Sequence, residues 1–165
     1  MTDHVDRVLA QWAAQRPDLD VSPMAVLGRL GRANRLTGTA MARTFADHGL
    51  DRASFDVLAT LRRNDPPHRL TPAELMRSAM VTSGAITQRL DRLQSRGLIT
   101  REPSPTDGRV VHVQLTAEGK ALIDRALPDH VATEERLLAG LTPQQRTDLA
   151  DILRTLLTSL GDTVF

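Results

Sequence analysis

The sequence predicts a mainly α-helical protein with a small β element, and three observations lead to that prediction. Apolar residues recur at helical spacing through most of the chain. Residues 98–102 and 109–115 instead read as two short strands, the second strictly alternating, with the turn-forming pair Asp107-Gly108 between them. Immediately before them, residues 70–96 read as helix, turn and helix. This order is that of a winged helix-turn-helix, with long helices added on both sides.

The bulk composition indicates a folded protein of a reducing compartment. The chain has 165 residues, 41% of them hydrophobic, which is enough for one domain or for two small halves that share a core. The absence of Cys excludes disulfides and thiolate metal sites. No apolar run approaches the roughly 20 residues of a membrane span, and the first residues lack the layout of a secretion signal. We therefore expect a cytoplasmic protein with no membrane contact and no cofactor.

Two helices are expected at the N-terminal end. Residues 3–15 place four apolar side chains at helical spacing: Val5, Val8, Leu9 and Trp12. A second helix is expected to have Ser22 as its N-cap and Pro23 in its first turn, and to reach about Phe45. Three basic residues follow one side of it: Arg29, Arg32 and Arg35. A solvated face is the favoured interpretation of this stripe, and direct phosphate contact is the alternative.

Two further helices are predicted on either side of a Pro-rich stop. Asp51 is expected to cap the first of them, whose inward side carries Phe55, Leu58 and Leu61. The segment Asn-Asp-Pro-Pro at residues 64–67 ends it. Thr71 and Glu74 then form a capping box around a proline in the first turn, which predicts a short helix over residues 72–77.

The next helix carries the side chains best suited to contact DNA. It is expected to start at Thr82 or Ser83, to bury Ile86, Leu90 and Leu93, and to end near Gly97. In a helix-turn-helix, the N-terminal residues of the second helix meet base edges in the major groove. Short and amide-bearing side chains can donate and accept hydrogen bonds there, and a glycine lets the backbone come close. The candidate DNA-contacting residues of this helix are Thr82, Ser83, Gly84, Thr87, Gln88 and Arg92.

The polar loop between the two strands is either an ordinary hairpin turn or a wing. Asp107 and Gly108 are turn-forming residues, and Arg109 follows them. The negative potential of a minor groove attracts Arg. Because a helix-turn-helix precedes the loop, we favour a wing in which Asp107 and Arg109 contact DNA over a hairpin with a surface Arg.

Two long helices are predicted after the strands. Thr116 caps the first, which is expected to reach about Ala139, and Pro128 within it predicts a kink or a break. Residues 142–145 form a second capping box. The helix after it has a wide apolar stripe: Leu149, Ile152, Leu153, Leu156, Leu157 and Leu160. Together with the first helix, this stripe is a candidate dimer surface, and an intramolecular core is the alternative.

With these elements placed, the chain resembles the MarR family of bacterial transcriptional regulators over nearly its full length. The resemblance rests on residues 70–99, on the wing stretch SPTDGRVVHVQLTAEGKAL at 104–122, and on LTPQQRTDLADILRTLL at 141–157. Many members have Asp where Ser104 stands. The resemblance implies a homodimer held together by the helical regions 1–50 and 116–165. Its two winged modules, residues 51–115, are expected to bind a pseudo-palindromic double-stranded DNA operator.

A narrower resemblance is to the urate-responsive subgroup of the family, the PecS and HucR type, which has an extra N-terminal helix bearing a Trp. Its ligand site combines that Trp with an Asp and an Asn of the helix before the recognition module, an Arg of the recognition helix and an Arg of the first wing strand. The resemblance assigns these roles to Trp12, Asp56, Asn64, Arg89 and Arg101. An aromatic face and guanidinium groups suit a flat anion, and a carboxylate can accept from ring N–H groups.

Position along the helices supports this ligand site only in part. Trp12 is as well explained as an apolar anchor of the first helix. Asp56 falls opposite the apolar stripe of its helix, so periodicity predicts an exposed side chain. Arg89 lies beside Ile86 and Leu93 on the helical wheel and is expected to need a buried acidic partner. A pair between Asp56 and Arg89 is therefore either a ligand trigger or a structural salt bridge.

The expected function is a nucleoid-associated transcriptional repressor, released from DNA by a small anionic aromatic effector such as urate or a related purine. One alternative is a regulator that responds to phenolic compounds instead. Another is a winged-helix protein-interaction module, which the net charge of only +1 favours. An enzyme or a metal sensor is not expected, because the five His residues are scattered and no phosphate loop or catalytic triad is recognisable.

Overall fold

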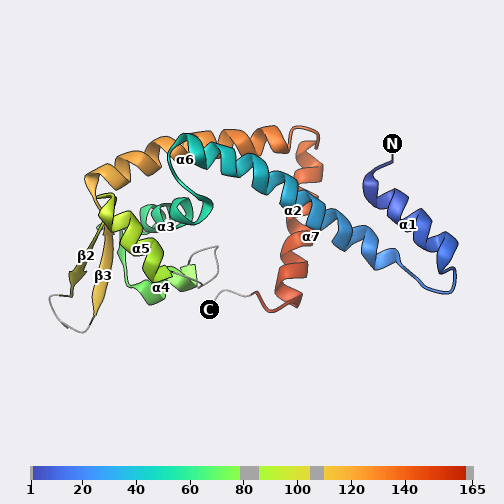
Figure 1. Ribbon diagram of the computed structural model, residues 1–165, viewed down its shortest axis with the longest axis horizontal. Coiled ribbons are helices and arrows are strands. Elements are labelled where there is room, and N and C mark those ends of the chain that lie inside the picture. Colours follow the sequence, from blue (N-terminus) through green and yellow to red (C-terminus); the bar gives the residue numbers. More distant parts are fainter. Residues whose placement is uncertain (1, 79–85, 105–109, 163–165) are drawn as a thin grey trace. The chain divides into compact units, whose positions relative to one another are not determined.

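The structure is a computed structural model that describes residues 2–78, 86–104 and 110–162. Along the chain, the described part contains helices α1 to α7 and a small sheet (Figure 1). One strand of the sheet lies between α3 and α4, and the other two lie between α5 and α6. The mainly α fold with a β wing is thereby confirmed. The chain divides into two compact units, Met1–Arg52 and Ala53–Phe165, each described by itself below. In the described ranges, no helix is both long and apolar enough to cross a membrane.

The first unit consists of α1 (His4–Gln15) and α2 (Ser22–Asp47). The Asp3 carboxylate caps α1 by accepting hydrogen bonds from the backbone N–H groups of Val5 at 2.7 Å and Asp6 at 2.9 Å. Val5 is 5% exposed and packs against α2. It contacts Gly28, where an added Cβ would lie 3.3 Å from a Val5 methyl carbon. The predicted amphipathic N-terminal helix is therefore confirmed.

The start of α2 differs from the prediction. Its N-cap is Val21, which makes no side-chain hydrogen bond, and Ser22 is already the first helical residue. The Asp20 carboxylate accepts from the Ser22 backbone N–H at 2.9 Å and from its hydroxyl at 3.1 Å. The assignment of Ser22 as N-cap is wrong, because the helix starts one residue earlier than predicted and Ser22 is already inside its first turn.

The core of the second unit lies around α3 (Arg52–Arg63). Phe55, Leu58 and Leu61 are buried as predicted, but so are Ser54, Val57 and Thr60. The helix is therefore surrounded on more than one side. The prediction of an exposed Asp56 is wrong for that reason, since its side chain is only 8% exposed. Periodicity identifies the most apolar side of a helix and does not detect a polar side that is also covered.

The helix-turn-helix is formed by α4 (Pro72–Ser78) and α5, described over Ile86–Ser95. The capping box of α4 is confirmed: Glu74 N–H donates to Thr71 Oγ1 at 3.2 Å, and Thr71 N–H donates to the Glu74 carboxylate at 2.7 Å. Leu90 and Leu93 are buried as predicted. Gly97 ends the recognition helix with a φ of +68°, a conformation that favours glycine. The expected turn after Ser78 and the predicted first residues of α5 lie outside the described residues.

The sheet has one strand more than predicted. β2 (Ile99–Pro103) pairs antiparallel with β3 (Val111–Leu115), in a register that places Ile99 opposite Leu115. The short strand β1 (Arg69–Leu70) pairs with the other edge of β3, which gives the order β1-β3-β2. Two residues are too few to show an alternating pattern, so periodicity does not reveal β1.

Two long helices complete the second unit, α6 (Ala117–Leu137) and α7 (Pro143–Ser159). The helix α6 runs through Pro128 without interruption, so the predicted break is wrong. A proline inside a helix costs about 3 kcal/mol, but buried residues on both sides of it, among them Ile123 and Thr133, hold the two halves in one helix. The capping box of Thr142 and Gln145 at the start of α7 is confirmed.

A close contact joins the end of the recognition helix to the start of α6. Thr116 donates from Oγ1 to the Gly97 carbonyl at 2.7 Å and from its backbone N–H to the Leu98 carbonyl at 3.2 Å. One turn later, Gly119 lies so close that an added Cβ would be 1.9 Å from the Leu98 carbonyl oxygen. Only glycine fits there. This junction fixes where α5 ends and the wing begins.

Candidate functional site

The outward side of α5 is polar and solvent-exposed. Thr87, Gln88 and Arg92 are exposed on it, whereas Leu90 and Leu93 on the opposite side are buried. The structure thus places these three predicted DNA-contacting side chains where base edges can reach them. The other predicted DNA contacts lie outside the described residues: Thr82, Ser83, Gly84, Asp107 and Arg109.

Arg101, predicted to bind ligand, connects the wing to the recognition helix. Its Nε donates to the Gln94 Oε1 of α5 at 2.6 Å, and its Nη2 is ion-paired with the Asp91 carboxylate. The Arg101 side chain is 23% exposed, so the pair is partly shielded from solvent. Sequence reasoning missed these two acceptors. Their spacing of three residues on the exposed side of one helix was the available signal, since such positions are neighbours.

A row of polar side chains follows one side of α3. Asp56 and Thr60 are four residues apart and therefore lie above one another on the helix, and Asn64 follows directly after its last residue. Asp56 is 8% and Thr60 0% exposed, and the Asn64 side chain donates to the Thr60 carbonyl at 2.6 Å. Thr60 Oγ1 is buried and has no hydrogen-bond partner among the described residues. Sequence reasoning missed Thr60, although the interval between Asp56 and Asn64 pointed to it.

Arg89 brings a buried cationic group to the recognition helix. Its side chain is half-buried, and its Nη1 atom is buried without a hydrogen-bond partner in the described part of the chain. Within that same part, no ion pair joins Arg89 to Asp56, so the expected acidic partner is not observed. Buried polar atoms are nearly always hydrogen-bonded, and an exception is a candidate for binding another molecule.

Trp12 belongs to the first unit, whereas the other four predicted ligand-binding residues belong to the second. Its side chain is 41% exposed on α1, which argues against a buried apolar anchor. The combination of Trp12 with Asp56, Asn64, Arg89 and Arg101 stays a prediction.

The start of α4 is electrostatically fixed. The hydrogen bond from the Thr71 backbone N–H is the main reason that the pKa of Glu74 lies below its usual value of 4.5, and the Thr71 hydroxyl lowers this pKa further. The Glu74 carboxylate is therefore ionised at neutral pH, and its hydrogen bonds to Thr71 stabilise the first turn of α4. Over the described ranges, no group of three or more His, Asp or Glu residues is arranged to hold a metal ion.

The fold and the exposed polar side of α5 define a winged-helix protein that binds DNA, and comparisons with known proteins specify the family. The MarR family profile matches residues 48–110. The HTH-type transcriptional regulator PecS of Dickeya dadantii is 39% identical over 149 residues, which covers 90% of this chain and 90% of that protein. The chain belongs to the MarR family of transcriptional regulators.

Solved structures agree with this assignment. Sco3205, a MarR family regulator from Streptomyces coelicolor solved in complex with DNA, has a TM-score of 0.77 and 27% identity, covering 86% of this chain and 89% of that one. BpsR of Bordetella bronchiseptica, whose DNA binding is regulated by 6-hydroxynicotinic acid, has a TM-score of 0.72 and 26% identity, covering 79% and 91%. These relatives are transcription regulators rather than enzymes.

Proposed function

We propose that the protein is a homodimeric repressor that binds a pseudo-palindromic operator and is released by a small anionic aromatic ligand such as urate. The single observation that carries the homodimer is the unburied apolar stripe of α7. No residue of this helix is buried within the chain, and Ile152 and Leu160 are 64% and 73% exposed. A large exposed apolar face marks an interface, and a symmetric pair of identical chains is the most common way to cover one.

A dimer of this kind presents two recognition helices to one duplex. The exposed Thr87 and Gln88 of each α5 then contact one half-site in the major groove. Two half-sites on the same side of B-DNA lie roughly 34 to 36 Å apart. Binding therefore depends on the distance between the two helices, and a ligand that changes this distance releases the operator.

The ligand class follows from the polar groups of the second unit. Thr60 Oγ1 and Arg89 Nη1 are buried and have no hydrogen-bond partner among the described residues. A bound ligand can supply hydrogen-bond partners for both atoms. An anionic ring oxygen pairs with a guanidinium, and ring N–H groups donate to a carboxylate such as Asp56. Urate offers both chemistries, whereas a simple phenol lacks the ring donors. The regulation of BpsR by 6-hydroxynicotinic acid, also a nitrogen heterocycle, supports this class.

Arg101 offers a way to couple the ligand to DNA. Its guanidinium binds Asp91 and Gln94 and so holds strand β2 to α5. A ligand anion competes for the same guanidinium. Once Arg101 turns to the ligand, α5 and the wing lose this connection and no longer hold the arrangement that fits the operator. Release requires the ligand to bind this second state more tightly than the first.

The test is a titration of urate into a complex of the protein with its operator, followed by fluorescence anisotropy of labelled DNA. We expect release at submillimolar to millimolar urate, and weaker release by salicylate at the same concentration. Arg89→Gln is expected to keep DNA affinity and to lose the response to urate. The matched variant Arg125→Gln, which removes one Arg from α6, serves as the control and is expected to respond normally.

Three results would contradict the proposal. Unchanged DNA affinity at millimolar urate removes urate as the effector. If salicylate releases the operator while urate does not, the effector is a phenolic acid. A failure of the wild-type chain to bind its own upstream DNA at low salt contradicts operator binding itself, because the electrostatic part of DNA affinity is strongest there.

A further inference from the structure

The helix α2 carries an unusual excess of positive charge. Its residues 22–47 contain four Arg and one acidic residue, Asp47 at the C-terminal end. Among the described residues, ion pairs neutralise one of the four: Arg29 binds Asp3 at 2.9 Å and Asp6 at 2.5 Å. In the described parts of the chain, Arg35 and Arg43 have no acidic partner. Within the described residues, the guanidinium groups of Arg35 and Arg43 are therefore not neutralised by an ion pair.

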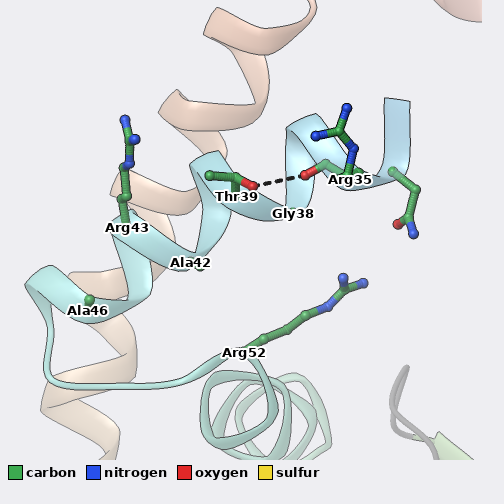
Figure 2. Close-up of a pocket in the computed structure, with 8 residues that line it drawn as sticks. Arg35, Gly38, Thr39, Ala42, Arg43, Ala46 and Arg52 are labelled. Atoms are coloured by element: carbon green, nitrogen blue, oxygen red, sulfur yellow. Dashed lines mark hydrogen bonds between the residues drawn. The ribbon is translucent and has the colours of Figure 1, made fainter. Parts of the chain in front are cut away.

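The uncompensated arginines surround a pocket of about 560 Å³ (Figure 2). Two neighbouring rows of α2, each with a spacing of four residues, form most of it. The row of small side chains lies at the base: Asn34, Gly38, Ala42 and Ala46. The adjacent row is polar and cationic: Arg35, Thr39 and Arg43. Arg52, at the start of α3, completes the lining, and it too has no acidic partner in the described chain.

The row of small side chains leaves free space above the helix backbone, and the adjacent row places guanidinium groups along the edge of the pocket. An added Cβ at Gly38 would meet no atom within 4 Å, so there is free space directly above the helix backbone. Figure 2 shows the Arg52 side chain extended beneath α2 toward the end where Arg35 lies, with Arg43 at the other end. A molecule in this pocket can therefore lie against the helix while guanidinium groups reach it from more than one direction.

We propose that this pocket binds a small polyanion, a molecule with two or more phosphate or carboxylate groups. Each guanidinium can fork two hydrogen bonds onto such a group. Arg35 and Arg43 are eight residues apart, which is about 12 Å along a helix. One monovalent anion cannot satisfy both of them, whereas a longer ligand with separated charges can. None of the pocket residues belongs to the proposed urate site, so the polyanion is a second ligand.

A DNA backbone is the other polyanion that could use these arginines, and the shape of the site favours the small molecule. The volume lies within the range of 300 to 1,000 Å³, roughly, that is usual for small-molecule sites. The side chains of the row from Gly38 to Ala46 are small, so a ligand can lie in a shallow recess against α2 beside the Arg52 side chain. Side chains that hold a duplex project from a surface and need no such recess.

The experiment is calorimetric titration of the full chain with sodium tripolyphosphate and, separately, with citrate, at constant ionic strength. We expect saturable binding of at least one of them to the wild type, and the stronger of the two identifies the phosphate or carboxylate class. Arg35→Gln and Arg52→Gln are each expected to weaken it by roughly tenfold or more, the value of one charge-assisted hydrogen bond. Arg154→Gln removes the same charge from α7, outside the pocket, and is expected to bind normally.

A second variant separates a shaped site from general positive charge. Ala42→Leu keeps every charge and a good helix former, but it places a bulky side chain on the base of the pocket. It is expected to lose polyanion binding while retaining the far-ultraviolet circular dichroism of the wild type. Operator affinity without added anion is expected to be the same in Arg35→Gln and in the wild type.

Several outcomes would overturn the proposal. They are the absence of saturable binding to the wild type, equal binding by Ala42→Leu, and equal weakening by Arg154→Gln. A loss of operator affinity in Arg35→Gln, together with unsaturable tripolyphosphate binding, would assign these arginines to the DNA backbone instead. None of these results depends on whether urate releases the operator, so this inference and the proposed function fail separately.

Discussion

The helices α5 and α7 have the same kind of sequence and different surroundings. Both show apolar residues at helical spacing, and both have polar opposite sides. On α5, Leu90 and Leu93 are 2% and 0% exposed, whereas on α7 no residue is buried and Leu160 is 73% exposed. The comparison teaches that periodicity reveals an apolar face but does not identify what covers it. The apolar face of α5 is covered by residues of the same chain, and we propose that the apolar face of α7 is covered by a second copy of the chain.

The largest expected effect comes from removing a buried leucine of α5. Leu93→Ala leaves a cavity at a fully buried position and is expected to lower the free energy of unfolding by about 2 to 5 kcal/mol. Urea denaturation measures it. In Leu157→Ala, the matched change on α7, the loss is expected to depend on protein concentration, because the contact removed lies between two chains. A loss that is the same at every concentration would place the α7 stripe within one chain.

A charge on α7 sharpens the same comparison. Ile152→Glu places a carboxylate in the proposed interface and is expected to weaken association by roughly a hundredfold, because a buried charge without a partner is costly. Sedimentation equilibrium measures the association. Thr147→Glu, on the opposite side of the same helix, is the control and is expected to associate like the wild type. Equal association of both variants would show that the stripe does not hold two copies together.

The junction behind α5 is expected to have the next largest effect. Gly119→Ala forces a Cβ against the Leu98 carbonyl, which the structure would place at 1.9 Å, and is expected to cost about 1 to 3 kcal/mol of unfolding free energy. Gly31→Ala is the matched control, because an added Cβ there meets nothing within 4 Å. It is expected to stabilise α2 by about 0.5 to 1 kcal/mol. Thermal unfolding of both variants separates the steric contact at position 119 from the higher helix propensity of Ala. If both changes shifted the unfolding temperature alike, the junction would not be tightly packed.

Removing the two capping boxes is expected to have a smaller effect, and one of similar size on both helices. Thr71→Ala removes the cap of α4, and Thr142→Ala removes that of α7, each at a cost of about 1 kcal/mol. Only Thr142→Ala is expected to weaken association as well, since it frays the helix that carries the unburied stripe. Urea denaturation at two protein concentrations separates these effects. Association that is weakened equally by both changes would contradict the assignment of the stripe to the dimer.

The smallest expected effect is a dependence on pH. Hydrogen bonds from Lys120 and then Arg62 hold the pKa of Asp124 below its usual value of 3.8. A pKa that is lower in the folded state means that the ionised carboxylate stabilises the fold above 3.8, and that this contribution disappears as pH falls through the folded-state pKa. The stability difference between the wild type and Asp124→Asn is therefore expected to shrink on acidification. A difference that stays constant down to acid unfolding would exclude this ion pair as its source.

The sequence predicted the parts of the fold that local chemistry decides. The capping boxes at Thr71 and Thr142, the glycine stop at Gly97 and the two longer wing strands were all recognisable, because each depends on residues close together in the chain. The errors concern non-local effects. The helix α6 tolerates Pro128 because of burial on both sides of it, and α3 buries Asp56 because more than one side of it is covered.

The sequence predicted which residues belong to the candidate site, but it did not predict what those residues contact. The polar exposed side of α5 followed from periodicity, since Thr87 and Gln88 lie opposite buried leucines. The resemblance to a known subgroup supplied Arg101, but no pattern in the sequence placed it against Asp91 and Gln94, which are brought to it by the pairing of separate elements. Thr60 was missed because its spacing from Asp56 and Asn64 does not by itself show that its hydroxyl is buried.

The exposed indole of α1 gives this molecule a built-in optical reporter. The chain has one Trp and no Tyr, so its intrinsic near-ultraviolet emission arises from Trp12 in the first unit. A quenching or a wavelength shift on adding a compound to the unlabelled chain then reports an event that reaches α1. Titrations followed in this way need no attached dye and no nucleic acid. They separate compounds whose binding changes the fluorescence of Trp12 from compounds whose binding does not.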